Sequence, residues 1–157
     1  MGMRQAGGRR LLVGIGFLIV MGIVATAGFS APMQPDMGMM AGNQLKTAIE
    51  HAKLAAGADA LAGVKSHLQH VVNCIEGPRG AMYKGMGGNP CQGQGKGLLP
   101  DAKAAGMKYE GLVPWIDLAN NIAAIGLKAT TPGKAKAAAW AVQATLEQTE
   151  KSMMMMK

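Results

Sequence analysis

The feature that most constrains the fold of this chain is a stripe of apolar residues with helical spacing between residues 59 and 76. Its members recur every three or four residues: Leu61, Val64, Leu68, Val71, Val72 and Ile75. Gly77 and Pro78 follow directly, and this pair is typical of a helix C-terminus. Aromatic residues make up only 4% of the chain, which argues against a β-sandwich or a β-barrel. The sequence therefore predicts an all-α fold.

Three further segments have helical periodicity, at residues 44–57, 101–129 and 132–152. Pro114 lies inside the second of these segments and predicts a kink or break just before it, because proline lacks a backbone N–H and clashes with the preceding turn. The expected N-caps are Asn43, Asp59 and Thr131. Short connections join the first helix to the second and the third to the fourth, so we expect an antiparallel four-helix bundle.

The chain begins with the three parts of a secretory signal. Three arginines in the N-terminal region precede an uncharged apolar run at residues 11–27, which ends in Ala25-Thr26-Ala27. We therefore expect residues 1–27 to be a signal peptide, with an uncleaved N-terminal membrane anchor as the alternative. Either one places the rest of the chain outside the cytoplasm, in the periplasm or secreted.

The remaining chain divides into a leader, a domain and a tail. Residues 28–43 are rich in Met, Pro and Gly without any period and predict a flexible leader. Residues 44–152 contain the helical bundle domain, and residues 153–157 form a methionine-rich tail. Without the three arginines of the signal, the net charge falls from +7 to +4, which indicates a soluble surface rather than a nucleic-acid-binding patch. Nucleic acid is therefore not an expected partner.

A glycine-rich segment at residues 77–99 separates the second predicted helix from the third and has no helical or strand pattern. Cys74 lies at the end of the second helix, and Cys91 lies inside this segment. Because we expect an oxidising compartment, these two cysteines are predicted to form a disulfide. The bond would close a loop of about 18 residues and stabilise the fold by about 3 kcal/mol in the chain-entropy model.

The three histidines of the chain are the main candidate metal ligands. His67 and His70 are three residues apart on the second predicted helix, on the flank that also carries Cys74. The disulfide would therefore fold the glycine-rich loop over them, and His51 on the first helix could approach His67. Imidazoles on facing helices of a bundle are typical of a site for copper, zinc, nickel or iron. The alternative is that the histidines hydrogen-bond to carbonyl groups of the loop and hold it in place.

Methionine is the other unusual feature, with 14 residues. Met82 and Met86 lie in the glycine-rich loop and are candidate ligands beside the histidines. Thioethers are soft ligands that suit Cu(I), so copper is the expected metal. The methionines clustered in the leader and in the tail are either further soft ligands or parts of an unstructured linker and a frayed helix end. A non-covalent haem held by a histidine with Met82 or Met86 is a further alternative, and the sequence has no CxxCH motif for covalent haem.

Catalysis has little support in the sequence. No GxSxG, HExxH or P-loop motif occurs, and both cysteines are expected to be paired, so we expect a binding protein rather than an enzyme. Trp115 is expected in the core, whereas Trp140 falls opposite the apolar side of the last helix. The main alternative is therefore a non-catalytic accessory or structural subunit, which would dock onto a membrane or periplasmic complex through the loop and Trp140.

Residues 47–77 resemble the small metal-binding protein family. The resemblance lies in the sequence Glu50-His51-Ala52-Lys53 and in the alanine and histidine residues that follow it. Proteins of that family are exported, histidine-rich helical bundles implicated in binding copper and other divalent metals, so the resemblance implies the same fold and ligand class. A second pattern, H-x-x-H-x-x-N-C-I-E-G followed by N-P-C, resembles a module of exported bacterial proteins of uncharacterised activity. In this chain the module contains His67, His70, Asn73, Cys74, Asn89 and Cys91.

Overall fold

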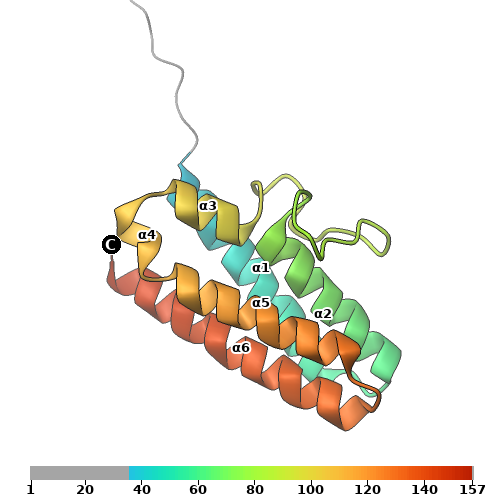
Figure 1. Ribbon diagram of the computed structural model, residues 1–157. Helices are drawn as coiled ribbons and strands as arrows, with labels where there is room; N and C mark the ends of the chain where they lie inside the picture. Colours follow the sequence, from blue (N-terminus) through green and yellow to red (C-terminus); the bar gives the residue numbers. More distant parts are fainter. Residues whose placement is uncertain (1–35, 157) are drawn as a thin grey trace, which may run out of the picture. The chain divides into compact units, whose positions relative to one another are not determined.

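The computed structural model describes residues 36–156, and every regular element in this range is a helix (Figure 1). The helices are α1 (Met37–Gly57), α2 (Leu61–Glu76), α3 (Leu98–Ala104), α4 (Met107–Glu110), α5 (Val113–Lys128) and α6 (Pro132–Met155). The expected all-α class is thereby confirmed. The expected signal peptide at residues 1–27 and the first part of the expected leader lie outside the described residues. None of the described helices is long and apolar enough to cross a membrane.

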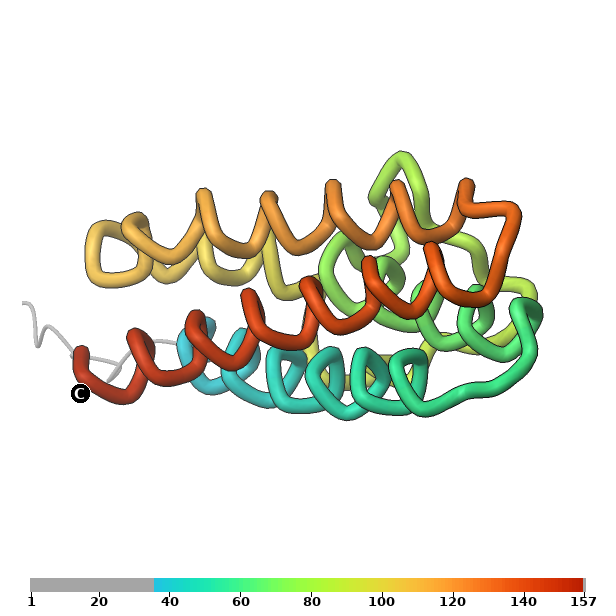
Figure 2. The backbone as a smooth tube through the Cα atoms, turned by 90° about the horizontal axis from the view of Figure 1, so that it is seen from below, coloured from blue at the N-terminus to red at the C-terminus, as the bar shows by residue number. Residues whose placement is uncertain are grey.

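The four long helices, α1, α2, α5 and α6, lie side by side (Figures 1 and 2). Helix α1 packs against α2 and α6, and α5 also packs against both α2 and α6. The short helix α3 contacts α1, α2 and α5. One hydrophobic core therefore joins all four long helices, and α1 and α2 form an interface along which their side chains meet.

Small residues allow the helices to approach closely in this core. Alanines make up five of the eight buried residues of α1 and three of the seven buried residues of α6. Gly126 on α5 has no room for a side chain, because a Cβ atom there would lie 2.6 Å from Cδ1 of Leu68 and 2.9 Å from Cβ of Ala138. The apolar stripe predicted for α2 is buried at every position except Leu61, which is partly buried against the core.

Helix α1 begins at Met37, well before the predicted start at residue 44. Asp36 is its N-cap, and Oδ1 of Asp36 accepts a hydrogen bond from the backbone N–H of Met39 at 3.0 Å. The prediction of a flexible leader up to residue 43 is therefore wrong for residues 37–43, which are helical because Ala41 packs in the core. The predicted tail is also partly helical, since α6 continues to Met155.

The other expected helix caps have different outcomes. Thr131 is the N-cap of α6, as predicted, and its Oγ1 accepts a hydrogen bond from the backbone N–H of Lys134 at 3.4 Å. Asp59 does not cap α2, because the helix begins one residue later, after Ala60, and has no side-chain cap. Gly77 ends α2 with a φ of 68°, as the glycine and proline pair predicted.

The helix predicted over residues 101–129 is divided into α3, α4 and α5. The first break is at Gly106, whose φ of 79° favours glycine, and the sequence analysis did not predict it. The second break is at Gly111 and Leu112, where a break was expected. Pro114 lies in the first turn of α5, where its missing N–H costs no helical hydrogen bond, so this proline helps to begin a helix instead of kinking one.

The connection between α2 and α3 is the glycine-rich loop, residues 77–97, and its two ends meet. A Cβ atom at Gly77 would overlap the carbonyl oxygen of Lys96, so only glycine fits at this crossing. Cys91 in the loop forms the predicted disulfide with Cys74 of α2, with the two Cα atoms 5.2 Å apart. A disulfide of this kind is typical of proteins in oxidising compartments.

Candidate metal centre

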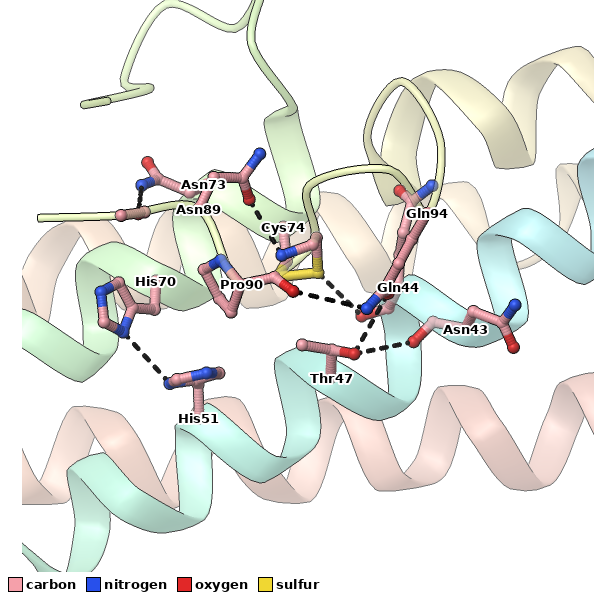
Figure 3. The surroundings of a disulfide bond; sticks show 12 residues. Asn43, Gln44, Thr47, His51, His70, Asn73, Cys74, Asn89, Pro90 and Gln94 are labelled. Carbon is pink, nitrogen blue, oxygen red and sulfur yellow. Dashed lines mark hydrogen bonds between the residues drawn. A yellow bond between two sulfur atoms is a disulfide. The ribbon is translucent and has the colours of Figure 1, made fainter. Parts of the chain in front are cut away.

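The three histidines lie together at the interface between α1 and α2. His67 and His70 are three residues apart on α2 and therefore project from the same side of that helix. His51 reaches both of them from α1. Figure 3 shows the imidazoles of His51 and His70 pointing toward each other, with ring centroids 4.7 Å apart. The centroids of His51 and His67 are 5.5 Å apart, which confirms the expected approach of these two residues.

The Nδ1 atoms of the three imidazoles converge. Nδ1 of His51 lies 3.3 Å from Nδ1 of His67 and 3.2 Å from Nδ1 of His70. Two nitrogens that bind one ion at about 2.0–2.1 Å in tetrahedral geometry are about 3.3 Å apart, so these separations fit a shared ion. One ligand atom from each histidine lies within 4.8 Å of the other two, and the three residues could hold a metal ion. Within residues 36–156, this is the only such group of three or more His, Cys, Asp or Glu side chains.

The loop determines which nitrogen of His70 carries a proton when the imidazole is neutral. Nε2 of His70 lies 2.8 Å from the carbonyl oxygen of Gly87. A carbonyl oxygen can only accept, so this contact assigns the proton to Nε2. Nδ1 of neutral His70 then carries a lone pair that faces His51. A backbone carbonyl that fixes the tautomer in this way is a common outer partner of a metal-binding histidine.

The metal-free arrangement leaves the hydrogen bonding of the three nitrogens incomplete. With a lone pair on Nδ1 of His70, the hydrogen bond between the two rings requires Nδ1 of His51 to donate. That single proton cannot also point fully at Nδ1 of His67, although this atom is equally close. The proton on Nδ1 of His51 therefore cannot make good hydrogen bonds to both other nitrogens, whereas one metal cation can accept a lone pair from each of the three.

The protonation of the cluster favours metal binding near pH 7. Burial lowers the pKa of His51 from 6.5 to about 4, with charge repulsion from His70 and His67 as the smaller causes, while Glu50 opposes the shift. Burial and then repulsion from His70 also lower the pKa of His67. Both imidazoles are therefore neutral near pH 7, and the neutral form is the one that binds metals.

Asn73 and the disulfide hold the part of the loop that reaches His70. Asn73 is 1% exposed, and its Nδ2 donates to the carbonyl oxygens of Lys84 at 2.8 Å and Gly88 at 3.0 Å. Its Oδ1 accepts from the backbone N–H of Lys84 at 3.0 Å. These bonds position the carbonyl of Gly87. The sequence could not predict which loop carbonyl meets a histidine, because a backbone carbonyl leaves no signal in a pattern of side chains. The hydrogen bond from His70 to Gly87 also means that this histidine helps to hold the loop, as the alternative interpretation expected.

The two loop methionines predicted as ligands lie in different surroundings. Met82 is partly buried and packs against the core, while its backbone carbonyl accepts a hydrogen bond from Nε2 of Gln69 at 2.9 Å. The side chain of Met86 is 93% exposed. Neither observation places a thioether against the imidazoles, whereas the three histidines contact one another directly.

A second buried polar cluster lies where the loop enters α3, and the sequence analysis did not identify it. Gln44 and Asp101 are fully buried, and Nε2 of Gln44 donates to Oδ2 of Asp101 at 2.7 Å. The same Oδ2 accepts from the backbone N–H of Lys96 at 2.8 Å. These bonds tie α1 to α3 and to the end of the loop, so they help to fix the frame in which the histidines lie.

The two tryptophans are both exposed. Trp115 is 47% exposed, so the expectation that it belongs to the core is wrong. It lies in the first turn of α5, whose buried residues are Ile116, Ala119, Asn120, Ala123 and Gly126. Trp140 is 64% exposed on α6, on the side away from the core, as the helical pattern predicted.

The histidine cluster offers three imidazole nitrogen ligands and leaves coordination positions open. A four-coordinate ion bound here would take its fourth ligand from water or from another molecule. The chain matches no protein-family model, and no match is found among curated proteins or solved structures.

Proposed function

We propose that this protein binds a transition-metal ion through His51, His67 and His70, and that it buffers or carries the metal rather than catalysing a reaction. The observation that carries the proposal is the convergence of the three Nδ1 atoms, with separations of 3.3 and 3.2 Å from His51 to its two neighbours. Three ligands from the protein hold an ion, and the open positions allow it to be passed on by ligand exchange. No described acidic residue joins the cluster to act as a general base.

Copper is the metal that this site favours. For a given set of nitrogen ligands, the affinity of divalent first-row metals rises to a maximum at Cu(II) and falls again at Zn(II). Imidazole also suits zinc, nickel and iron, so availability decides among them where copper is scarce. We therefore expect Cu(II) to compete successfully with Zn(II) at this site.

The proposed setting is the periplasm or the extracellular space, and the proposed scaffold is an antiparallel four-helix bundle. The basic, apolar and small-residue parts of residues 1–27 support export, and the disulfide supports an oxidising compartment. The packing of α1 against α2 supports a site between facing helices, which is where bundles commonly hold metals. The resemblance of residues 47–77 to the small metal-binding protein family supports the same function.

A bare ion fits the cluster better than a haem does. A haem iron takes its two axial ligands from opposite faces of a wide flat ring. The gap of 3.2 Å between Nδ1 of His51 and Nδ1 of His70 has room for an ion between the ligands but not for a macrocycle with one imidazole on each face.

The second candidate function is that of a non-catalytic accessory subunit on a membrane or periplasmic complex. The observation that favours it is the exposure of both tryptophans, together with Ile125, which is 67% exposed on α5. Aromatic residues are enriched on the surfaces through which proteins contact partners. This function requires no metal. The finding that the protein binds no metal ion would therefore support it over the first proposal.

Native mass spectrometry of the exported protein, before and after titration with Cu(II) and Zn(II), tests the metal-binding proposal. We expect one ion per chain, retained against a weak chelator, and we expect Cu(II) to displace Zn(II). The variant His67→Ala with His70→Ala should lose this ion and keep its helical circular dichroism spectrum. Asn121→Ala, a change on α5 away from the cluster, is the matched control and should bind as the wild type does.

The same variants separate metal binding from a purely structural role of the histidines. If the histidines only hold the loop, the double variant melts at a lower temperature whether or not metal is present, and the wild type retains no ion. That result would overturn the proposal and leave the accessory subunit as the better supported function.

A further inference from the structure

The fold brings the two methionine-rich segments of the chain to one place. One segment is the start of α1, which contains Met37, Met39 and Met40, and the other is the end of α6, which contains Met153, Met154 and Met155. Helices α1 and α6 pack against each other, and Figure 2 shows the first turns of α1 beside the last turns of α6. The sequence separates these methionines by more than one hundred residues, so their meeting follows only from the structure.

Three of these methionines line a single cavity of about 480 Å³. Met153 is the innermost, with 6% of its surface exposed, and its Sδ would lie 3.7 Å from a Cβ atom at Gly42, so the thioether rests against the backbone of α1. Met39 and Met154 are 63% and 54% exposed and stand on the solvent side of the same cavity. One fixed thioether and two unbranched, flexible ones can close around a small ligand.

The charges around this cavity balance. Lys46 and Lys108 line it together with Asp36 and Glu150, so it carries no net charge that would select an anion or a divalent cation. The neutral side chains of the lining include the polar groups of Asn43 and Tyr109 and the three thioether sulfur atoms, which are the polarizable ones. Thioethers are the soft ligands that suit Cu(I), and they do not bind protons in the pH range of proteins.

We propose that Met39, Met153 and Met154 form a second metal site, which takes a soft monovalent ion of the Cu(I) type. This site is independent of the histidine cluster, because Met39 and His51 are twelve residues apart on α1, or about 18 Å along the helix axis. Its affinity does not depend on pH between pH 5 and pH 8, because no ligand loses a proton on binding. The protein therefore has a nitrogen site and a sulfur site for metals of different softness.

The test uses Ag(I), a soft ion that is not oxidised in air, and Cu(I) under reducing conditions that leave the disulfide intact, both added to the full exported protein. With ¹³C-labelled methionine methyl groups, we expect the NMR signals of Met39, Met153 and Met154 to shift on addition of the first equivalents of Ag(I). The signals of Met86 and Met107, which are 93% and 89% exposed and do not line the cavity, should stay in place. Shifts spread equally over all methionines would overturn the proposal, because they would indicate unspecific binding.

Leucine variants inside and outside the cavity test whether the three methionines determine the affinity for Cu(I). Replacing Met39, Met153 and Met154 by leucine keeps the side-chain volume and apolar character, and we expect at least a tenfold weaker affinity for Cu(I) against a competing chelator. The control, Met86→Leu with Met107→Leu, should bind as the wild type does. Both measurements are repeated in the His67→Ala with His70→Ala background, so that a failure of the histidine site and a failure of the sulfur site are told apart. Unchanged Cu(I) affinity in the leucine variant, with its circular dichroism spectrum preserved, would overturn the proposal.

Discussion

His51 is the residue on which the candidate metal centre depends, because its Nδ1 lies 3.3 Å from Nδ1 of His67 and 3.2 Å from Nδ1 of His70. It comes from α1, whereas His67 and His70 both come from α2, so removing it would leave a pair on one helix. Its position in the packed interface lowers its pKa to about 4. Packing at this interface therefore fixes the position of the His51 imidazole, and burial keeps the imidazole in the neutral form that binds a metal.

The metal-free protein should lose stability as the pH falls from about 6.5 to about 4. In this window the folded protein keeps His51 neutral, whereas the unfolded chain, with an ordinary pKa of 6.5, binds a proton. The unfolded state then binds more protons, so acid favours unfolding, by on the order of 1 kcal/mol when the solvent exposure of the ring is allowed for. Urea unfolding across this pH window measures the effect, and His51→Asn should flatten the slope. An equal slope in both proteins would show that the pKa of His51 is not lowered.

Asn73→Ala should cost about 2–3 kcal/mol of stability, because it removes the three hydrogen bonds that the buried side chain of Asn73 makes with the backbone of Lys84 and Gly88. Denaturant unfolding measures the loss, and hydrogen exchange should show faster exchange at the Lys84 amide. Asn121→Ala is the control of the same chemistry, since Asn121 is exposed and, within residues 36–156, its side chain bonds only to Asp117. Equal stability of the two variants would contradict the role assigned to Asn73.

At the scale of elements, the glycine-rich loop is the part that connects covalent structure to the histidine site. The disulfide attaches the loop to the last turn of α2, and the carbonyl of Gly87 then reaches His70.

Replacing both cysteines by serine should lower the stability by about 3 kcal/mol in the chain-entropy model and weaken metal binding by about tenfold, as loss of an outer partner does. Unfolding curves and competition titration measure the two effects. Amide exchange in α5 and α6 should remain slow, and a variant with unchanged metal affinity would show that the loop does not position His70.

The elements also show what sequence reasoning could find. Helix α2 was predicted closely, because its apolar stripe is dense and a glycine and proline pair marks its end. The start of α1 was missed, because residues 37–43 are rich in methionine and glycine and become helical through packing against α6, a contact that no local pattern reports. In the site, the side chains of His51, His67 and His70 were found from their spacing. A bond from the histidines to a loop carbonyl was the alternative interpretation, but the choice of Gly87 was not predicted, because it is a backbone group whose position depends on the disulfide and on Asn73.

At the scale of the whole molecule, the proposed metal should act as a cross-link between helices. An ion held by His51 on α1 and by His67 and His70 on α2 binds only when these helices are packed, so it stabilises the folded state by mass action. Free ion at 100 times the dissociation constant would contribute about 2.7 kcal/mol. For a domain of this size, that gain corresponds to a rise in melting temperature of roughly 10 °C.

Thermal unfolding with and without Cu(II) or Zn(II) measures this stabilisation. We expect the melting temperature to rise with the concentration of free ion, to return on addition of a chelator, and to stay constant in the variant His67→Ala with His70→Ala. The cysteine variant should show a smaller rise, because its weaker affinity lowers the ratio of free ion to dissociation constant. The leucine variant of the sulfur site should show the full rise with Zn(II), because its histidines are intact and thioethers bind this ion weakly. An equal rise in the wild type and the double histidine variant would mean that the ion binds elsewhere, and that the three imidazoles serve only to join α1, α2 and the loop.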